Sequence, residues 1–257
     1  MTASPIKAMI LAAGRGERMR PLTDRTPKPL LPVRGKPLMQ WPLEALARGG
    51  FASVVVNTAW LGDQIVDHFG SGIAFQPSST MREQLLNSEQ TEIVYSHEGR
   101  DFGAALETAG GIVRALPLLD EIFWVLAGDV FAPTFVFAQS AVERFAASGK
   151  LAHIWLVPNP AHNPKGDFGL GEAGLARNQA EVKYTYSTIG LYHRDLFAPP
   201  YCDIPAGNPH GTKAPLAPLL RAAMDNGHVS AELYSGTWTD VGTPDRLHSL
   251  NQVTQPE

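Results

Sequence analysis

The sequence predicts an α/β fold in which a mixed, mostly parallel central sheet is flanked by helices in three layers. Short apolar runs alternate with amphipathic stretches of helical length, and this alternation is typical of βαβ units. The apolar runs are nearly continuous, as expected for parallel strands that are buried on both faces. Hydrophobic residues make up 44% of the 257 residues and charged residues 18%, so the chain has enough apolar material for a full core.

Six strands are expected from the apolar runs. The first is followed by Ala-Ala-Gly, the second contains three consecutive valines, and the fourth is followed by Gly-Asp. In chain order they are Ile6–Leu11, Ser53–Asn57, Glu92–Ser96, Ile122–Ala127, Leu151–Val157 and Thr185–His193. Beyond about residue 150, Gly, Pro and Asn become more frequent, which predicts antiparallel strands and long loops in that half.

Six helices are expected where apolar and polar residues recur at helical spacing. In chain order they are Leu38–Arg48, Asp63–Phe69, Leu106–Leu116, Phe135–Ala147, Pro215–Asn226 and Pro244–Val253. The polar segment Gln76–Gln90 interrupts the pattern. We expect it to form a surface insertion or loop, with a short helix at Met81–Leu86.

The charge balance and the cysteine count exclude several classes of protein. The chain has 21 Lys+Arg against 25 Asp+Glu, a net charge of -4, and so lacks the basic excess that nucleic-acid or membrane-surface binding requires. The single cysteine, Cys202, excludes an internal disulfide framework and a cysteine-cluster zinc site, and it fits a reducing compartment. The apolar run Ala8–Ala13 is too short for a signal peptide or a membrane span. We therefore expect a cytoplasmic protein.

A glycine-rich loop, which begins with Ala12–Gly16 and runs on to Thr23, follows the first expected strand. In open α/β sheets, ligands bind beyond the carboxyl ends of the strands. Gly14 and Gly16 can adopt positive φ, which lets successive N–H groups converge on an anion. The dinucleotide-binding fingerprint is excluded because Met19 stands where its third glycine belongs. A tight turn at the end of the strand would explain the glycines alone equally well.

The cations in and after this loop favour a phosphate ligand. Arg15, Arg18 and Arg20 lie within the loop, and Lys28 follows between two prolines. The prolines hold the backbone extended, so that Lys28 can direct its ammonium group at a phosphate. An arginine binds phosphate through its planar guanidinium group.

Two aspartates, Asp129 and Asp240, are candidates for binding a metal ion. Asp129 comes directly after the strand Ile122–Ala127 in Gly-Asp, and Asp240 lies in Trp-Thr-Asp-Val-Gly-Thr. Mg²⁺ is typically held by one or two carboxylates together with substrate phosphates. Either aspartate could instead cap a turn or a helix, but Thr243, directly before Pro244, is the better helix cap and leaves Asp240 available.

Residues 11–33 resemble the signature of the sugar-1-phosphate nucleotidyltransferases. That signature reads Leu-Ala-Ala-Gly-x-Gly-x-Arg-Met-x-Pro-Leu-Thr, followed by Pro-Lys-Pro-Leu-x-Pro-Val. The resemblance covers about residues 6–250. It implies a Rossmann-like nucleotidyltransferase fold, with one domain over residues 1–257. Within that domain, it implies a nucleotide-binding half at about 6–130 and a sugar-binding half at about 131–250.

The resemblance also implies roles for individual residues. The catalytic residues would be Arg18, Lys28, Asp129 and Asp240, with both aspartates binding Mg²⁺. The nucleotide-binding residues would be Leu11, Ala12, Ala13, Gly14, Gly16, Arg18, Lys28, Glu98, Thr108 and Gly110. The sugar-binding residues would be Asn159, Asp167, Gly169, Ser187, Thr188 and Lys213. From the residues alone, the segment around Glu98–Gly110 could equally be the capped start of a helix, and the segment around Asn159–Thr188 could be plain turns and a strand. Lys213 could equally be a solvated surface residue.

Within the family, Leu-Glu-Thr-x-Gly-Gly-Ile, Asn-Pro-x-His and Lys-x-Pro-Leu-x-Pro-Leu-Leu-Arg most resemble the uridylyltransferases that act on N-acetylmuramate 1-phosphate in cell-wall sugar recycling. This implies uridylyl transfer from UTP to that sugar phosphate or a related one. The chain departs from their pattern at Ala109 and in the longer segment Gln76–Gln90. One alternative is a glucose- or mannose-1-phosphate nucleotidyltransferase that uses dTTP or GTP. A second is a nucleotide-sugar glycosyltransferase, although the Asp-x-Asp motif of such enzymes is missing. A third is a non-catalytic nucleotide sensor.

Overall fold

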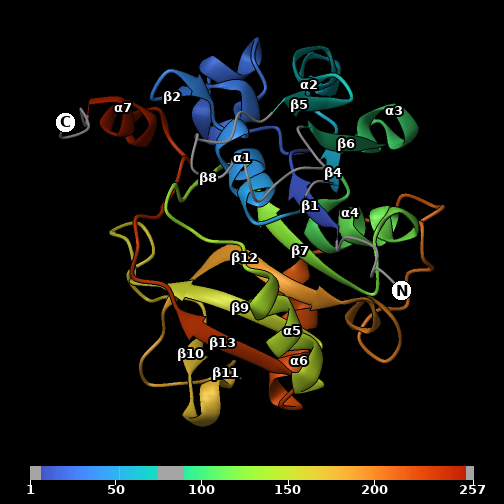
Figure 1. Cartoon of the computed structure of the whole chain (residues 1–257), viewed down its shortest axis with the longest axis vertical. Coiled ribbons are helices and arrows are strands. Elements are labelled where there is room, and N and C mark those ends of the chain that lie inside the picture. Colours follow the sequence, from blue (N-terminus) through green and yellow to red (C-terminus); the bar gives the residue numbers. More distant parts are fainter. Residues whose placement is uncertain (1–6, 52, 75–89, 253–257) are drawn as a thin grey trace, which may run out of the picture.

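The computed structural model describes residues 7–51, 53–74 and 90–252, and its centre is an eight-stranded sheet with the order β13-β9-β12-β7-β1-β4-β6-β5 (Figure 1). The strands are β1 (Ala8–Leu11), β4 (Ser53–Thr58), β5 (Gly72–Ala74), β6 (Gln90–His97), β7 (Ile122–Ala127), β9 (Ala152–Val157), β12 (Thr185–His193) and β13 (Val229–Leu233). Strands β7, β1, β4 and β6 pair in parallel, and so do β9 and β13. Only β12 and the edge strand β5 run the other way. The predicted mixed, mostly parallel sheet is confirmed.

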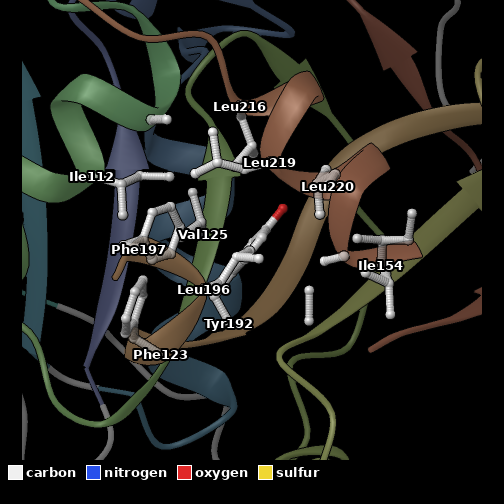
Figure 2. Packing of buried hydrophobic residues seen from close by; sticks show 14 of the residues in the cluster. Ile112, Phe123, Val125, Ile154, Tyr192, Leu196, Phe197, Leu216, Leu219 and Leu220 are labelled. Carbon is white, nitrogen blue, oxygen red and sulfur yellow. The ribbon is translucent and has the colours of Figure 1, made fainter. Parts of the chain in front are cut away.

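Helices cover both faces of the sheet and complete the predicted three layers. Helices α1, α2 and α5 contribute to the core on one face, and α4 and α6 to the core on the other. Residues of β7 alternate between the two cores: Phe123 and Val125 face α4 and α6 (Figure 2), whereas Trp124 and Leu126 face the opposite core. The helices are α1 (Gln40–Arg48), α2 (Gly62–Phe69), α3 (Glu98–Phe102), α4 (Glu107–Ala115), α5 (Gln139–Ser148), α6 (Leu216–Asp225) and α7 (Pro244–Gln252).

Some expected boundaries were wrong. The helix expected from Phe135 begins only at Gln139, because Phe135 and Phe137 are buried and pack edge-on against Trp124. The strands β5 and β13 and the helix α3 were not anticipated. The expected insertion Gln76–Gln90 lies outside the described residues except for Gln90, and its expected helix Met81–Leu86 lies wholly outside them.

A third apolar cluster joins the C-terminal helix to the segments that follow β1 and β7. Its buried members are Met19, Leu31, Val33, Leu38, Phe131, Val241, Leu247 and Leu250. Figure 1 shows α7 beside β2 (Pro32–Val33). Next to this cluster, β8 (Val130–Phe131) pairs with β14 (Thr239–Asp240), so that two segments distant in sequence meet. Within the described ranges, no helix is long and apolar enough to cross a membrane.

Candidate active site

A cleft of about 380 Å³ opens at the carboxyl ends of β1 and β7, where the glycine-rich loop begins. All the nucleotide-binding residues that the sequence predicted line this cleft, except Gly110. Asp129 also lines it, together with Glu107 and Gly242. The structure therefore gathers the glycine-rich loop, Lys28 and the end of β7 around one space.

Gly16 is the glycine whose backbone shapes the loop. It adopts φ +67°, and a Cβ atom there would lie 3.0 Å from Cγ2 of Thr23. The Thr23 hydroxyl donates a hydrogen bond to the Gly16 carbonyl at 2.8 Å, and the Met19 N–H donates to the same carbonyl at 2.9 Å. Gly14 does not have the positive φ that we expected; it is exposed and faces open space.

The three loop arginines have different surroundings. Arg15 donates hydrogen bonds to the Thr23 carbonyl and to Asp24, and Arg20 also donates to Asp24. The hydrogen bond from Arg15 is the main reason that the pKa of Asp24 is lowered from its ordinary value. Arg18 lines the cleft, is exposed, and forms no ion pair within the described part of the chain. Arg18 is thus the loop cation available to a ligand.

Lys28 reaches across the cleft to the second segment of the site. Its Nζ atom lies 2.5 Å from Oδ2 of Asp129, and the lysine is only 8% exposed. The preceding Pro27 is extended, and residues Lys28–Leu30 form a tight 3₁₀ turn that holds the lysine in place. A buried ammonium group paired with a half-exposed carboxylate is well placed to meet phosphate oxygens and a metal ion.

Asp240 lies beside Asp129 through the pairing of β14 with β8. The Val241 N–H donates a hydrogen bond to the Asp129 carbonyl at 2.8 Å. The carboxylate of Asp240 contacts Arg246 and, at 3.0 Å, Nε2 of His162. The Thr243 hydroxyl accepts a hydrogen bond from the Arg246 N–H at 3.4 Å, as expected of a residue that caps α7.

The residues around these aspartates suit Mg²⁺, which takes some of its ligands from substrate phosphates, better than a metal ion whose ligands all come from the protein. In the part of the chain that the structure describes, no three His, Cys, Asp or Glu side chains cluster closely enough to hold a metal ion. Asp129 directly precedes β8, and Asp240 lies in the paired strand β14, so the site offers the one or two carboxylates with which proteins typically hold Mg²⁺ alongside substrate phosphates. Asp240 itself is not among the residues that line the cleft, although Gly242 is.

A buried carboxylate, Glu98, lies beneath the floor of the cleft and organises its backbone. Glu98 is fully buried; it accepts hydrogen bonds from the Asn57 amide at 2.6 Å and from the Leu106 N–H at 2.7 Å. Asn57 in turn accepts a hydrogen bond from the Ala12 N–H at 2.7 Å. Burial raises the pKa of Glu98 above its ordinary value. Sequence reasoning missed Asn57, although a polar residue at the end of a valine-rich strand is a usable signal.

Gly110 has a packing role in the structure. The N–H groups of Ala109 and Gly110 both donate to the Ala214 carbonyl, so neither N–H group is free to bind a ligand. A Cβ atom at Gly110 would lie 2.6 Å from the Thr212 carbonyl oxygen. The small residue therefore lets α4 pack closely against the segment that precedes α6.

A second cavity of about 520 Å³ adjoins the cleft on the face of the sheet covered by α4 and α6. The two cavities share the lining residues Leu11, Glu107, Thr108 and Ala127. Two of the predicted sugar-binding residues, Asp167 and Thr188, line the second cavity.

Thr188 and Asp167 differ in whether their side-chain oxygens have hydrogen-bond partners. Thr188 sits at a bulge in β12 with φ +63°, and its hydroxyl oxygen is buried without a hydrogen-bond partner among the described residues. The carboxylate of Asp167 accepts a hydrogen bond from the Tyr186 N–H at 2.8 Å.

The structure does not bring the other predicted sugar-binding residues to this cavity. Asn159 donates to the Lys183 carbonyl at 2.8 Å, and Ser187 is fully buried and donates to the Trp155 carbonyl at 2.6 Å. Gly169 is packed so closely that a Cβ atom would lie 2.3 Å from that of Ala180. Lys213 is exposed and lines neither cavity.

Comparison with known proteins relates this arrangement to a family of transferases. A family model described as nucleotidyl transferase matches residues 7–256. The chain is 44% identical to N-acetylmuramate alpha-1-phosphate uridylyltransferase of Neisseria meningitidis over 94% of this chain and 95% of that protein. It is 31% identical to UTP–glucose-1-phosphate uridylyltransferase of Synechocystis over 98% of this chain and 64% of that protein. A Bacillus anthracis structure assigned as a glucose-1-phosphate thymidylyltransferase shares the fold, with a TM-score of 0.74 at 18% identity, and covers 98% of each chain.

Proposed function

Because the chain belongs to the nucleotidyl transferase family, we propose that it transfers a uridylyl group from UTP to N-acetylmuramate 1-phosphate, giving a UDP-sugar and pyrophosphate. Two relatives support UTP as the donor, since both are named uridylyltransferases. The relative at 44% identity, which matches over nearly its whole length, supports N-acetylmuramate 1-phosphate as the acceptor.

The observation that carries the proposal is the meeting of Lys28 with Asp129 at the mouth of the glycine-rich loop, with Asp240 alongside. In the proposed reaction, an acceptor phosphate oxygen attacks the α-phosphorus of UTP in line, and pyrophosphate leaves. The attacking oxygen is already anionic, so no protein nucleophile or base is required. Catalysis then depends on positioning and on neutralising charge.

Each element of the cleft has a task in this reaction. The loop backbone and Arg18 would bind the triphosphate, and Lys28 would offset the charge that develops on the transferring and leaving groups. Asp129 and Asp240 would hold Mg²⁺, which neutralises phosphate charge when bound. The neighbouring cavity, which shares four lining residues with the cleft, would hold the acceptor sugar.

A pyrophosphate-release matrix tests the proposal. UTP, dTTP, GTP and ATP are each combined with the 1-phosphates of N-acetylmuramic acid, N-acetylglucosamine, glucose and mannose. We expect the largest kcat/KM for UTP with N-acetylmuramate 1-phosphate, and a loss of orders of magnitude in Lys28→Ala and Asp129→Asn. Wild-type rates in both variants would refute the assigned roles, and no pyrophosphate from any pair would refute the enzyme class in favour of a nucleotide-binding module.

A second candidate acceptor is glucose 1-phosphate, which the Synechocystis relative favours. The same matrix separates the two, because a preference for glucose 1-phosphate would appear directly in kcat/KM. Activity with dTTP or GTP in place of UTP would support the thymidylyl or guanylyl alternatives. Thermal-shift measurements with UTP and with a UDP-sugar separate nucleotidyl transfer from glycosyl transfer.

The place of the reaction in the cell follows from its substrates. Activation of a cell-wall amino sugar phosphate with UTP would return that sugar to nucleotide-sugar pools in the cytoplasm. The free thiol Cys202, which is buried, is compatible with a reducing compartment.

A further inference from the structure

The second cavity contains a single cationic side chain among the described residues that line it, Arg221 of α6. Its other charged lining groups are the carboxylates of Asp167 and Glu107. Glu107 also lines the cleft, whereas Arg221 belongs only to the second cavity. Lys28 and Arg18 line only the cleft. The two cations that suit phosphates therefore lie in one cavity, and Arg221 lies in the other.

Arg221 is held in place by contacts that leave most of its donors unused. One terminal nitrogen, Nη1, donates to the Asn178 side-chain oxygen at 2.6 Å, and Asn178 itself donates to Asp225 at 3.1 Å. The guanidinium carbon lies 4.9 Å from the centre of the buried Phe168 ring, which also lines the cavity. Arginine has five N–H donors in a fixed planar arrangement that matches a carboxylate. The described residues engage only one of its nitrogens.

An anionic substituent on the acceptor sugar is the group that this arrangement fits. Carboxylates such as Asp167 and Glu107 suit sugar hydroxyls and repel a second carboxylate, so an acidic sugar requires a compensating cation in the same cavity. N-acetylmuramate differs from N-acetylglucosamine by a lactyl ether that carries a carboxylate. Resting on the proposed function, we propose that Arg221 binds the lactyl carboxylate and thereby selects the acidic sugar phosphate over its neutral counterparts.

The test compares three acceptors with saturating UTP: N-acetylmuramate 1-phosphate, its lactamide, in which the carboxylate becomes a neutral amide of similar size, and N-acetylglucosamine 1-phosphate. The wild-type protein should prefer the acid over the lactamide. In Arg221→Gln, kcat/KM should fall about 10- to 100-fold for the acid, because a charge-assisted hydrogen bond is lost, and should stay within about twofold for the two neutral acceptors. Arg221→Lys, which keeps the charge, should recover part of the loss.

A matched control separates the local contact from a general change of charge. Arg177→Gln removes an exposed arginine of β11 (Ala176–Arg177), which packs against α6 but lines neither cavity. This variant should keep the wild-type preference for the acid. Thermal unfolding of each variant shows whether the loss of the contacts to Asn178 and Phe168 has changed the fold.

Two outcomes would overturn the inference. An equal loss for all three acceptors would place Arg221 on the phosphate or in a structural role. An unchanged preference for the acid in Arg221→Gln would remove it from recognition. If no acceptor releases pyrophosphate, the proposed reaction fails. Calorimetric titration of the acid and the lactamide into wild type and Arg221→Gln then decides the inference separately, since only selective binding of the acid by the wild type supports it.

Discussion

Glu98→Gln removes a buried negative charge while keeping the size of the side chain. The two partners of Glu98, the Asn57 amide and the Leu106 N–H, are both donors, so both of its oxygens must accept. A glutamine has only one oxygen, and its NH₂ group would face a donor. Asn57 cannot adapt by rotating its amide, because its oxygen already accepts from the Ala12 N–H. The substitution therefore leaves one buried donor without a partner.

The expected cost is about 2 kcal/mol of unfolding free energy, the usual magnitude for one unsatisfied buried donor. For a chain of this length, that corresponds to a fall in Tm of roughly 4–8 °C. The pH dependence has a definite sign. Burial raises the pKa of Glu98 in the folded state, so its contribution to stability is fully present below the unfolded-state pKa and is lost as the pH rises through the folded-state pKa. Because glutamine does not titrate, the stability of Glu98→Gln should lack this dependence on pH.

Thermal and denaturant unfolding at pH 5, 6 and 7 measure both effects. Glu143→Gln, which neutralises an exposed carboxylate on α5, is the matched control and should leave Tm within about 1 °C of the wild type. KM for UTP should also rise in Glu98→Gln, because Asn57, which accepts a hydrogen bond from the Ala12 N–H, loses the carboxylate that fixes its amide group. A Glu98→Gln protein as stable as the wild type at every pH would refute the view that this carboxylate holds the floor of the cleft.

Three further outcomes are expected from the same geometry. Lys28→Met should lower kcat about 10²- to 10³-fold with an unchanged near-UV circular dichroism spectrum, whereas Arg20→Gln, outside the cleft, should act like the wild type. Asp240→Asn should raise the Mg²⁺ concentration needed for half-maximal pyrophosphate release about tenfold, and an unchanged value would remove this residue from metal binding. Gly111→Ala should lower Tm and activity together, because its Cβ would lie 2.5 Å from Oε1 of Glu98; a neutral result would mean that the network beneath the cleft shifts freely.

The sequence predicted the strands at the centre of the sheet better than the short strands at its edges. Ile122–Ala127 was predicted to the residue because its continuous apolar run identifies a strand that is covered on both faces. Thr185–His193 was also predicted to the residue, from its β-branched and aromatic residues. The strand β13 was missed because it is short and two of its five residues are polar, and its place is set by pairing with β9. The helix expected from Phe135 starts late because aromatic packing on the sheet outweighs helical periodicity.

The site divides in the same way between local motifs and long-range geometry. The glycine-rich loop, Lys28 and Asp129 could be placed because each is fixed by its own neighbours in sequence. Ser187 and Thr188 could not both face a cavity, because neighbouring residues of a strand point to opposite sides, and the structure turns Thr188 toward it. Which of the two faces the cavity depends on the bulge in β12, which the sequence does not reveal.

The position of Asp240 depends on the folding of the C-terminal end of the chain. The pairing of β14 with β8 involves only two residues on each strand, too few to fix the aspartate by themselves. Val241, which follows Asp240, is fully buried in the same apolar cluster as Met19 from the glycine-rich loop and Phe131 from β8. One small core therefore holds the loop that we propose to bind the triphosphate and the segments that carry both aspartates. Because Leu247 and Leu250 of α7 belong to the same core, the packing of α7 contributes to the placement of the segments that carry both aspartates.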